Sequence, residues 1–169
     1  METTDGLPLV RAMEREDVGE ALLLMRELAR IEGYLAQLAV TERDLLTHGF
    51  GPTACFQAFV AQREAGAPLD GLAVTYLIPW TYDLRPTVVL KELVVAEHAR
   101  GIRVGAALLA QVARYALARS AARVAWTVLT DNTRAQRFYG RCGAKADERW
   151  QNWSLDEEAI RQLSESEHR

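Results

Sequence analysis

The segment Thr87–Val95 (TVVLKELVV) constrains the fold of this chain more than any other feature of its sequence. It is almost continuously apolar and rich in β-branched residues, which is typical of a central strand whose two faces are both covered. Only Lys91 and Glu92 interrupt it. A charged pair inside such a strand needs a reason, and chemistry performed by the carboxylate is one.

The sequence on either side predicts helices and strands that alternate around this central strand. Thr41, with Asp44 three residues later, is a helix-capping signal, and Asp17 precedes an apolar helical stripe. We therefore expect an α/β protein whose mixed sheet carries helices on both faces. The predicted strands cover residues 7–12, 56–63, 71–80, 87–95 and 123–129, with one or two more within 145–155, and the predicted helices cover residues 18–29, 42–47, 105–117, 132–141 and 156–163.

Composition limits the class of protein. The 169 residues are 49% hydrophobic and 25% charged, which predicts one globular domain over 1–169 and excludes intrinsic disorder, collagen-like repeats and coiled coil. The longest uncharged apolar run, 104–112, is far shorter than the ~20 residues of a membrane-spanning helix. The N-terminus lacks a secretion signal, so we expect a cytoplasmic protein without a membrane partner. Cys55 and Cys142 have neither CxxC nor metal-ligand spacing, so we expect reduced thiols that are packed or idle, and no metal.

Basic residues concentrate in one third of an otherwise acidic chain. Residues 100–149 carry ten Lys and Arg against three Asp and Glu, although the whole chain has 20 against 23. Such asymmetry suggests that a phosphate-bearing partner meets this third of the chain, with solvated helix faces as the alternative. We do not expect nucleic acid as the partner, because apolar helix positions interrupt the basic residues and the whole chain is acidic.

Two motifs within this basic third carry the chemistry. In the first, a glycine-containing turn at 100–106 leads from a strand into a helix, where main-chain N–H groups and the positive end of the helix dipole can bind phosphate. In the second, Asn132 can cap a short helix that carries Tyr139 next to Phe138. Taken alone, the first motif is compatible with an ordinary turn, and Tyr139 with a core position.

Together, ARGIRVGAALL and NTRAQRFYGRCGA resemble the paired signatures of the GNAT superfamily of acetyl-CoA-dependent N-acetyltransferases. Further segments, among them TERDLLTHGFG, FQAFVAQ and LKELVV, follow the order and spacing of its spermidine/spermine N-acetyltransferase branch, which includes diamine and thialysine acetyltransferases. The resemblance covers roughly residues 8–155. It implies a homodimer and the GNAT fold, with a mixed, mostly antiparallel central sheet of about six to seven strands that is splayed at its central strands.

The resemblance also implies where acetyl-CoA, the cosubstrate, would bind. The main chain of the central strand would bind the pantetheine arm and the thioester carbonyl, and the turn at 100–106 would bind the pyrophosphate. Arg103 departs from the family pattern because it stands where the first of two glycines is expected; its guanidinium could add a phosphate contact or hinder close approach. The expected cofactor-binding residues are Leu93, Val94, Val95, Arg100, Gly101, Ile102, Arg103, Val104, Gly105, Ala106, Asn132, Ala135 and Tyr139.

Two side chains match catalytic roles. Tyr139 matches the family's general acid, which assists the departing thiolate, whose thiol has a pKa near ~8.5. An alkyl ammonium, with a pKa near ~10.4, must lose a proton before it attacks. Glu92 is the candidate base, because burial in an apolar strand would raise its pKa. The alternative for Glu92 is a structural carboxylate paired with a neighbouring arginine.

The expected substrate pocket departs from that of polyamine-binding relatives. Glu32 matches an acid of the family, but a typical Tyr is replaced by Ile31, and three typical acids are replaced by Leu35, Ala36 and Lys91. Because long polycations need several carboxylates, we expect a shorter primary amine: a diamine, or a basic amino acid such as thialysine, ornithine or lysine, whose carboxylate Lys91 could pair. The alternatives are a protein or peptide acetyltransferase and a non-catalytic acyl-CoA-binding module. The expected substrate-binding residues are Glu32, Ile31, Trp80, Lys91, Glu92 and Trp126.

Overall fold

The computed structural model describes residues 7–101 and 103–166 of the chain. They fall into two compact units, Met1–Thr127 and Val128–Arg169. The expectation of a single domain over 1–169 stays a prediction. Ile102, one of the expected cofactor-binding residues, lies outside the described residues.

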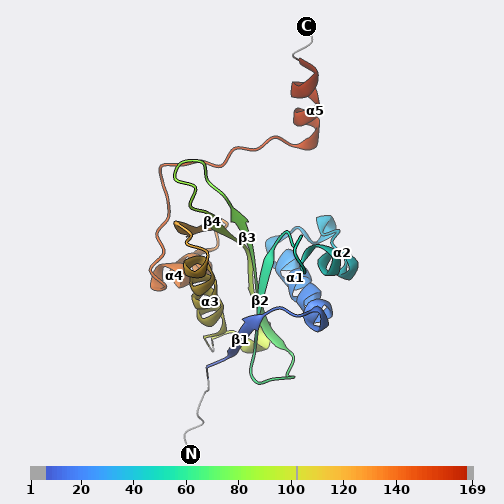
Figure 1. Ribbon diagram of the computed structural model, residues 1–169, viewed down its shortest axis with the longest axis vertical. Coiled ribbons are helices and arrows are strands. Elements are labelled where there is room, and N and C mark those ends of the chain that lie inside the picture. Colours follow the sequence, from blue (N-terminus) through green and yellow to red (C-terminus); the bar gives the residue numbers. More distant parts are fainter. Residues whose placement is uncertain (1–6, 102, 167–169) are drawn as a thin grey trace, which may run out of the picture. The chain divides into compact units, whose positions relative to one another are not determined.

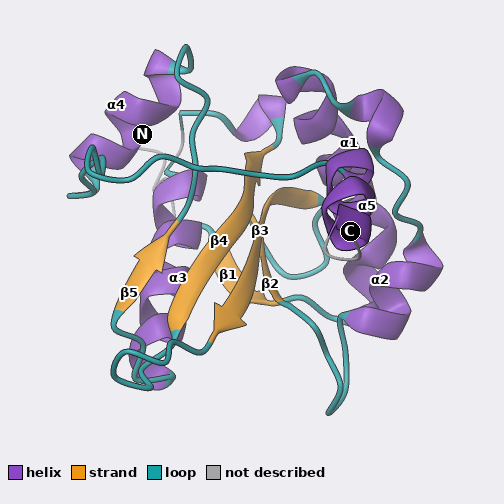
Figure 2. Cartoon of the chain, turned by 90° about the horizontal axis from the view of Figure 1, so that it is seen from above, coloured by secondary structure: helices purple, strands orange, loops and turns teal. Residues whose placement is uncertain are grey.

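Within the described residues of the first unit, five strands form one mixed sheet in the order β1-β2-β3-β4-β5. Figure 2 shows these strands with the helices around them. The pairs β1–β2, β2–β3 and β3–β4 are antiparallel, and β4–β5 is parallel. The central strand β4 has the bounds that its apolar run predicts. The strands are β1 Leu9–Ala12, β2 Gln57–Gln62, β3 Leu69–Ile78, β4 Thr87–Val95 and β5 Arg123–Ala125.

Helices cover both faces of this sheet, as predicted. Helices α1 (Val18–Glu32) and α2 (Glu42–His48) lie on one side and α3 (Val104–Ala118) lies on the other (Figure 1). α1 contacts β3 and β4, and α3 contacts β2, β3 and β4. Short 3-10 helices cover Arg15–Asp17, Leu35–Gln37 and Glu97–Ala99.

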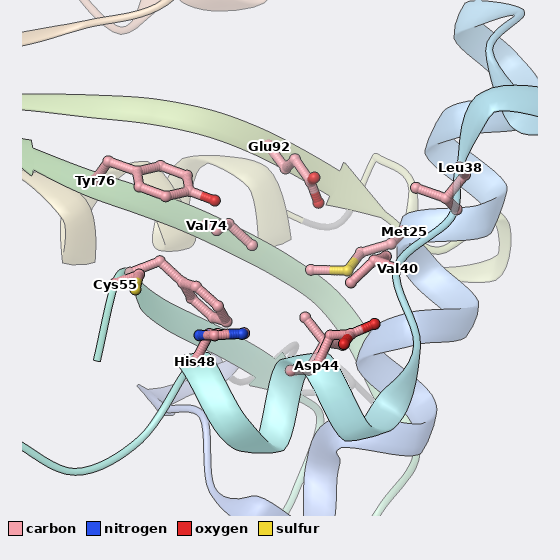
Figure 3. Close-up of a pocket in the computed structure, with 11 residues that line it drawn as sticks. Met25, Leu38, Val40, Asp44, His48, Cys55, Val74, Tyr76 and Glu92 are labelled. Carbon is pink, nitrogen blue, oxygen red and sulfur yellow. The ribbon is translucent and has the colours of Figure 1, made fainter. Parts of the chain in front are cut away.

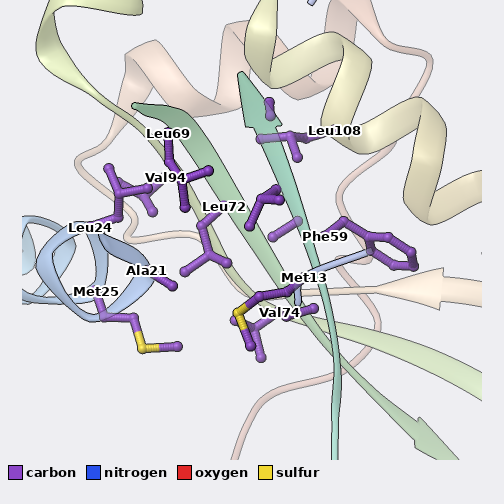
Figure 4. Close-up of a cluster of buried hydrophobic side chains, with 14 of the residues drawn as sticks. Met13, Ala21, Leu24, Met25, Phe59, Leu69, Leu72, Val74, Val94 and Leu108 are labelled. Atoms are coloured by element: carbon purple, nitrogen blue, oxygen red, sulfur yellow. The ribbon is translucent and has the colours of Figure 1, made fainter. Parts of the chain in front are cut away.

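The core fills both faces of the sheet. On the α1 side, Leu24, Leu72 and Val94 converge, and none of them is more than 6% exposed (Figure 4). Burying each such side chain contributes about 1.5–3 kcal/mol to stability. On the other side, a Cβ on Gly71 would lie 2.9 Å from atoms of both Leu108 and Val104, so the missing side chain lets α3 approach β3 closely.

A β-bulge at Lys91 orients the acidic side chain of β4. Val74 pairs with Glu92, whereas Thr75 pairs with Leu90, so Lys91 is an extra residue without a partner in β3. One extra residue resets the alternation of faces, and Glu92 therefore shares a face with Val74, on the side of α1 and α2. The bulge explains the charged pair in the apolar run, because it leaves Lys91 exposed while Glu92 turns inward.

The two capping signals predicted for α1 and α2 have different outcomes. At α2 the capping box is confirmed: Asp44 N donates to Thr41 Oγ1 (3.3 Å) and Thr41 N donates to Asp44 Oδ2 (2.9 Å). Asp17 occupies the N-cap position of α1, but its carboxylate makes no cap hydrogen bond. It accepts two hydrogen bonds from Arg11, at 2.6 and 2.9 Å, and these hold the pKa of Asp17 below its usual value.

The second unit contains two helices in its described residues, α4 (Thr133–Arg141) and α5 (Glu157–Ser166). Asn132 caps α4 as predicted, because its Oδ1 accepts a hydrogen bond from Ala135 N at 3.0 Å. Asp156 caps α5 in the same way through Ala159 N, at 2.8 Å.

The prediction of six to seven strands is wrong for the part of the chain that the structure describes, where five form. No strand forms within 145–155: Trp150 and Trp153 are 74% and 89% exposed, and a strand without a neighbour to cover its apolar side chains is not stable. The strand predicted at 123–129 ends at Ala125, because β5 pairs with β4 only opposite Thr87–Val89. None of the described helices is long and apolar enough to cross a membrane.

Candidate active site

A pocket of ≈ 390 Å³ lies on the face of β3 and β4 that α1 and α2 cover (Figure 3). Its wall is mostly apolar, and none of the described residues that line it is Lys or Arg. Such a pocket suits a small ligand with an aliphatic part and a positive charge, because acids are the only fully charged groups that face it. The lining residues are Met25, Leu38, Val40, Asp44, Leu45, His48, Cys55, Phe56, Val74, Tyr76 and Glu92.

Glu92 is the half-buried acid of this pocket. Its Oε2 is inaccessible to solvent and accepts no hydrogen bond in the described part of the chain. Burial raises the pKa of Glu92; the positive charge of Lys91 lowers it, and the negative charge of Glu32 raises it further. No arginine among the described residues forms an ion pair with Glu92, so the structural alternative of an arginine-paired carboxylate has no support.

Two tyrosines lie within the electrostatic reach of Glu92. Burial, and after it the charge of Glu92, raises the pKa of both Tyr34 and Tyr76, so both stay protonated hydrogen-bond donors at neutral pH. Tyr76 projects into the pocket from β3, and its ring centroid lies 6.2 Å from that of Phe56 (Figure 3). Glu32, predicted to bind substrate, is exposed at the end of α1 and contributes its charge to this site.

Sequence reasoning predicted none of the other lining residues, and it missed five titratable residues in or near this site: Tyr34, Asp44, His48, Cys55 and Tyr76. The spacing of Asp44 and His48 is a usable signal, because side chains four positions apart on α2 share one helix face. The charge of His48 lowers the pKa of Asp44, after the larger effect of its hydrogen bonds to Thr41. The thiols were expected to be packed or idle, and they are not packed: Cys55 and Cys142 are free and exposed, and Cys55 lines the pocket.

The outer edge of β4 is open beyond Val89. β5 pairs only with Thr87–Val89, and no other described strand pairs with the rest of this edge. Ala96 N donates to Asp70 O at 2.8 Å, on the side of β3. In an antiparallel pair the N–H and C=O groups of alternate residues point to the same neighbour, so those of Val94 also point toward β3. The N–H groups of Leu93 and Val95 therefore face the open edge. The splay expected at the central strands stays a prediction.

The start of α3 has no side-chain cap among the described residues. Its N-cap residue, Arg103, makes no side-chain cap hydrogen bond, and no acid lies in the first turn. The N–H groups of Val104, Gly105 and Ala106 thus lack a capping side chain at the positive end of a 15-residue helix. At Gly101 (φ +90°), a Cβ would meet nothing within 4 Å, so the main chain there is accessible.

Arg103 adopts a left-handed backbone conformation, with φ 64° and ψ 4°. This explains why a glycine is expected there, because a side chain in this region costs about 1 kcal/mol. Arg103→Gly should therefore raise the free energy of unfolding by about 0.5–1 kcal/mol, measured by urea denaturation. Arg114→Gly, inside α3, is the control and should lower it by about 1 kcal/mol. If Arg103→Gly lowered the free energy of unfolding as much as Arg114→Gly does, the main chain at Arg103 would not be strained.

Five of the six predicted substrate residues, Glu32 among them, are not in the pocket lining. Ile31 and Lys91 are exposed. Trp80 follows β3, and the guanidinium of Arg123 lies 4.1 Å from its ring centroid, a cation–π contact. Trp126 is half-buried and packs against the core. Glu92 alone of the predicted substrate residues lines the pocket.

In the second unit, α4 carries the remaining predicted residues. Asn132 and Ala135 bond to each other in the helix cap. Tyr139 is half-buried, and its ring centroid lies 5.0 Å from that of Phe138. The role of Tyr139 as general acid stays a prediction. The described residues contain no group of three or more metal-ligating side chains.

The described residues thus combine a mixed α/β sheet with an open edge, a helix start without a side-chain cap and a pocket that contains the carboxylate of Glu92. The sequence matches the acetyltransferase (GNAT) family over residues 52–144, and the chain belongs to this family of N-acetyltransferases. Thialysine N-epsilon-acetyltransferase of Sus scrofa is 28% identical to it over 165 residues, which cover 92% of this chain and 96% of that protein. Spermidine/spermine N(1)-acetyltransferase-like protein 1 of Homo sapiens is 27% identical over 161 residues, which cover 89% of this chain and 23% of that protein.

Solved structures share the fold. An integron cassette protein from the mobile metagenome of V. cholerae has a TM-score of 0.76 at 21% identity, and the match covers 95% of this chain and 99% of that one. An aminoglycoside acetyltransferase from an uncultured soil metagenomic sample, in complex with sisomicin, has a TM-score of 0.75 at 15% identity, covering 90% and 98%. The α/β GNAT fold is thus established for this chain, with five strands in its described sheet.

Proposed function

We propose that this chain transfers an acetyl group from acetyl-CoA to the primary amine of a small molecule by direct attack. The proposal rests on Glu92, whose buried Oε2 accepts no hydrogen bond from the described residues. Glu92 lines a pocket whose described lining contains neither Lys nor Arg. Such a carboxylate can bind an ammonium group and accept its proton. The likeness to thialysine N-epsilon-acetyltransferases supports the same class of substrate.

The residues present fit acetyl-CoA. The N–H groups of Val104, Gly105 and Ala106 would hold its pyrophosphate, because the start of α3 has neither a capping side chain nor an acid. The N–H groups of Leu93 and Val95 would bind its arm and its thioester carbonyl along the open edge of β4. Bound there, acetyl-CoA supplies an acetyl group activated as a thioester.

Two side chains would transfer the two protons of the reaction, one from the attacking ammonium and one to the leaving thiolate. Glu92 accepts the proton of the incoming ammonium, and its raised pKa makes it a stronger base than an exposed carboxylate. Tyr139, by the resemblance, holds the proton that the leaving sulfur needs. Direct attack requires no nucleophile from the protein, so neither cysteine has a covalent role.

The pocket favours short amines. Its volume of ≈ 390 Å³ is at the small end of the range for ligand sites, and the acids that a long polycation requires are replaced at Leu35, Ala36 and Lys91. Lys91 lies outside the lining but next to Glu92, so a carboxylate-bearing amine would meet it only at the rim. Both short diamines and thialysine-like amino acids remain within this class.

A thiol-release assay with acetyl-CoA tests the proposal. Thialysine, ornithine, lysine, short diamines and spermine are compared, with a reaction without amine as the control for hydrolysis. We expect at least one short amine to have a kcat/KM about tenfold or more above that of spermine. Equal turnover of spermine would overturn the preference for short amines. Turnover of peptide lysines alone would indicate a protein acetyltransferase, and CoA binding without any turnover would indicate a binding module.

A further inference from the structure

Arg100 and Glu27 form an ion pair that joins the two halves of the proposed site. Nη2 of Arg100 donates to Oε1 of Glu27 at 2.7 Å, and Nε of the same guanidinium donates to Val95 O at 3.3 Å. Glu27 lies on α1, two residues after Met25, which lines the pocket. One side chain therefore connects the helix of the amine pocket, the open edge of β4 and the loop before α3.

This pairing leaves Arg100 with little charge to offer a phosphate. The side chains of Arg100 and Glu27 are only 31% and 24% exposed, and a carboxylate at 2.7 Å cancels most of the field of the guanidinium. Its Nε–H is also in use, at Val95 O. Arg103 differs, since it is exposed and its side chain makes no hydrogen bond or ion pair within the described part of the chain.

We propose that Arg100 is a positioning residue for acetyl transfer, not a phosphate ligand, and that Glu27 is the partner through which it acts. This inference rests on the proposed function. By bonding Val95 O, Arg100 fixes the peptide planes at the end of β4, where the N–H groups of Leu93 and Val95 face outward. Glu27 fixes the guanidinium in turn, and it ties α1 to the same point.

The expected consequence is a loss of rate without a loss of cosubstrate affinity. Main-chain donors stabilise the negative charge that develops on the thioester oxygen only when they are correctly placed, and a displacement of about 1 Å can cost up to 10²-fold in rate. The pyrophosphate, by contrast, would be held by main-chain N–H groups of α3, which do not depend on the Arg100 side chain.

Arg100→Gln, Glu27→Gln and the double variant test this inference. At saturating substrates we expect kcat to fall about tenfold in each single variant, and no further in the double variant, because both substitutions remove the same contact. The Kd for CoA, measured by calorimetry, should stay within about threefold of the wild type, and its salt dependence should be unchanged. Arg114→Gln and Glu16→Gln, at exposed positions, are the matched controls and should keep the wild-type kcat.

If Arg100 instead bound phosphate, the two single variants would change the affinity for CoA in opposite directions. Arg100→Gln would then weaken CoA binding about tenfold with a smaller salt dependence, whereas Glu27→Gln would tighten it by releasing the guanidinium. That pattern, or wild-type kcat in both single variants, would overturn the inference. Failure of the wild type to bind CoA would instead overturn the proposed function, and it is detected before any variant is compared. Urea denaturation of each variant confirms that rates are compared between folded proteins.

Discussion

Glu92→Gln is expected to lower kcat/KM for the amine by about 10²- to 10³-fold. A primary ammonium has a pKa near ~10.4, so at pH 7 only about one molecule in 2,500 is neutral and able to attack. Glutamine keeps the size of the side chain and its place on the pocket wall, but it cannot accept the proton. Initial rates of thiol release at subsaturating amine measure the loss.

The pH dependence gives a second measurement of the same role. Burial raises the pKa of Glu92 above its usual value. Because the base must be ionised, the wild-type kcat/KM should rise with pH through that raised pKa, and the Gln variant should lack this limb. The free energy of unfolding changes with pH in the opposite direction to kcat/KM. Because the pKa of Glu92 is raised in the folded protein, the stability that protonated Glu92 contributes is present at low pH and is lost as pH rises through the raised pKa. The Gln variant should therefore be more stable than the wild type at neutral pH.

A loss of rate together with a gain in stability cannot be explained by unfolding. Glu64→Gln makes the same chemical change at an exposed position between β2 and β3, and it should leave both the rate and the pH profile unchanged. Wild-type rates in the Glu92→Gln variant would assign this carboxylate a structural role. A loss of stability at neutral pH would show that it has a partner in the folded protein.

Local sequence signals predicted the parts of the fold that depend on local physics. The apolar run predicted β4 with its observed bounds, and the Thr41–Asp44 pair predicted the start of α2. The burial of Glu92 was also predictable, because an acid within an apolar strand has few exposed places to occupy. The strand predicted within 145–155 failed because periodicity states what a strand would bury but not whether a neighbouring strand exists.

The rest of the site depends on contacts between distant residues. The bulge at Lys91 is set by the register of β3 against β4, and no local pattern specifies that register. Asp44 and His48 share a helix face, but that this face lies over β3 and β4 is a result of packing. Arg100 was predicted to belong to the turn that binds the pyrophosphate, and the structure pairs its side chain with Glu27, 73 residues away in the chain.

Tyr139→Phe is expected to lower kcat by about 10²-fold and to leave the Kd for CoA unchanged. The departing thiolate belongs to a thiol with a pKa near ~8.5, and a phenol with a pKa near ~10 can donate a hydrogen bond or a proton as that charge develops. Phenylalanine retains the aromatic ring, whose centroid lies 5.0 Å from that of Phe138, so packing on α4 is preserved. Thiol release measures kcat, and calorimetry measures the Kd.

The dependence on the leaving group separates a proton-donating role from a positional one. Acetyl thioesters of more acidic thiols need the proton less, so the Tyr139→Phe penalty should shrink as the pKa of the leaving thiol falls. Tyr82→Phe, at a side chain that is 87% exposed between β3 and β4, is the control and should show no penalty with any donor. A penalty of equal size for every thiol would contradict proton donation, because only a proton donor responds to the basicity of the group that it protonates.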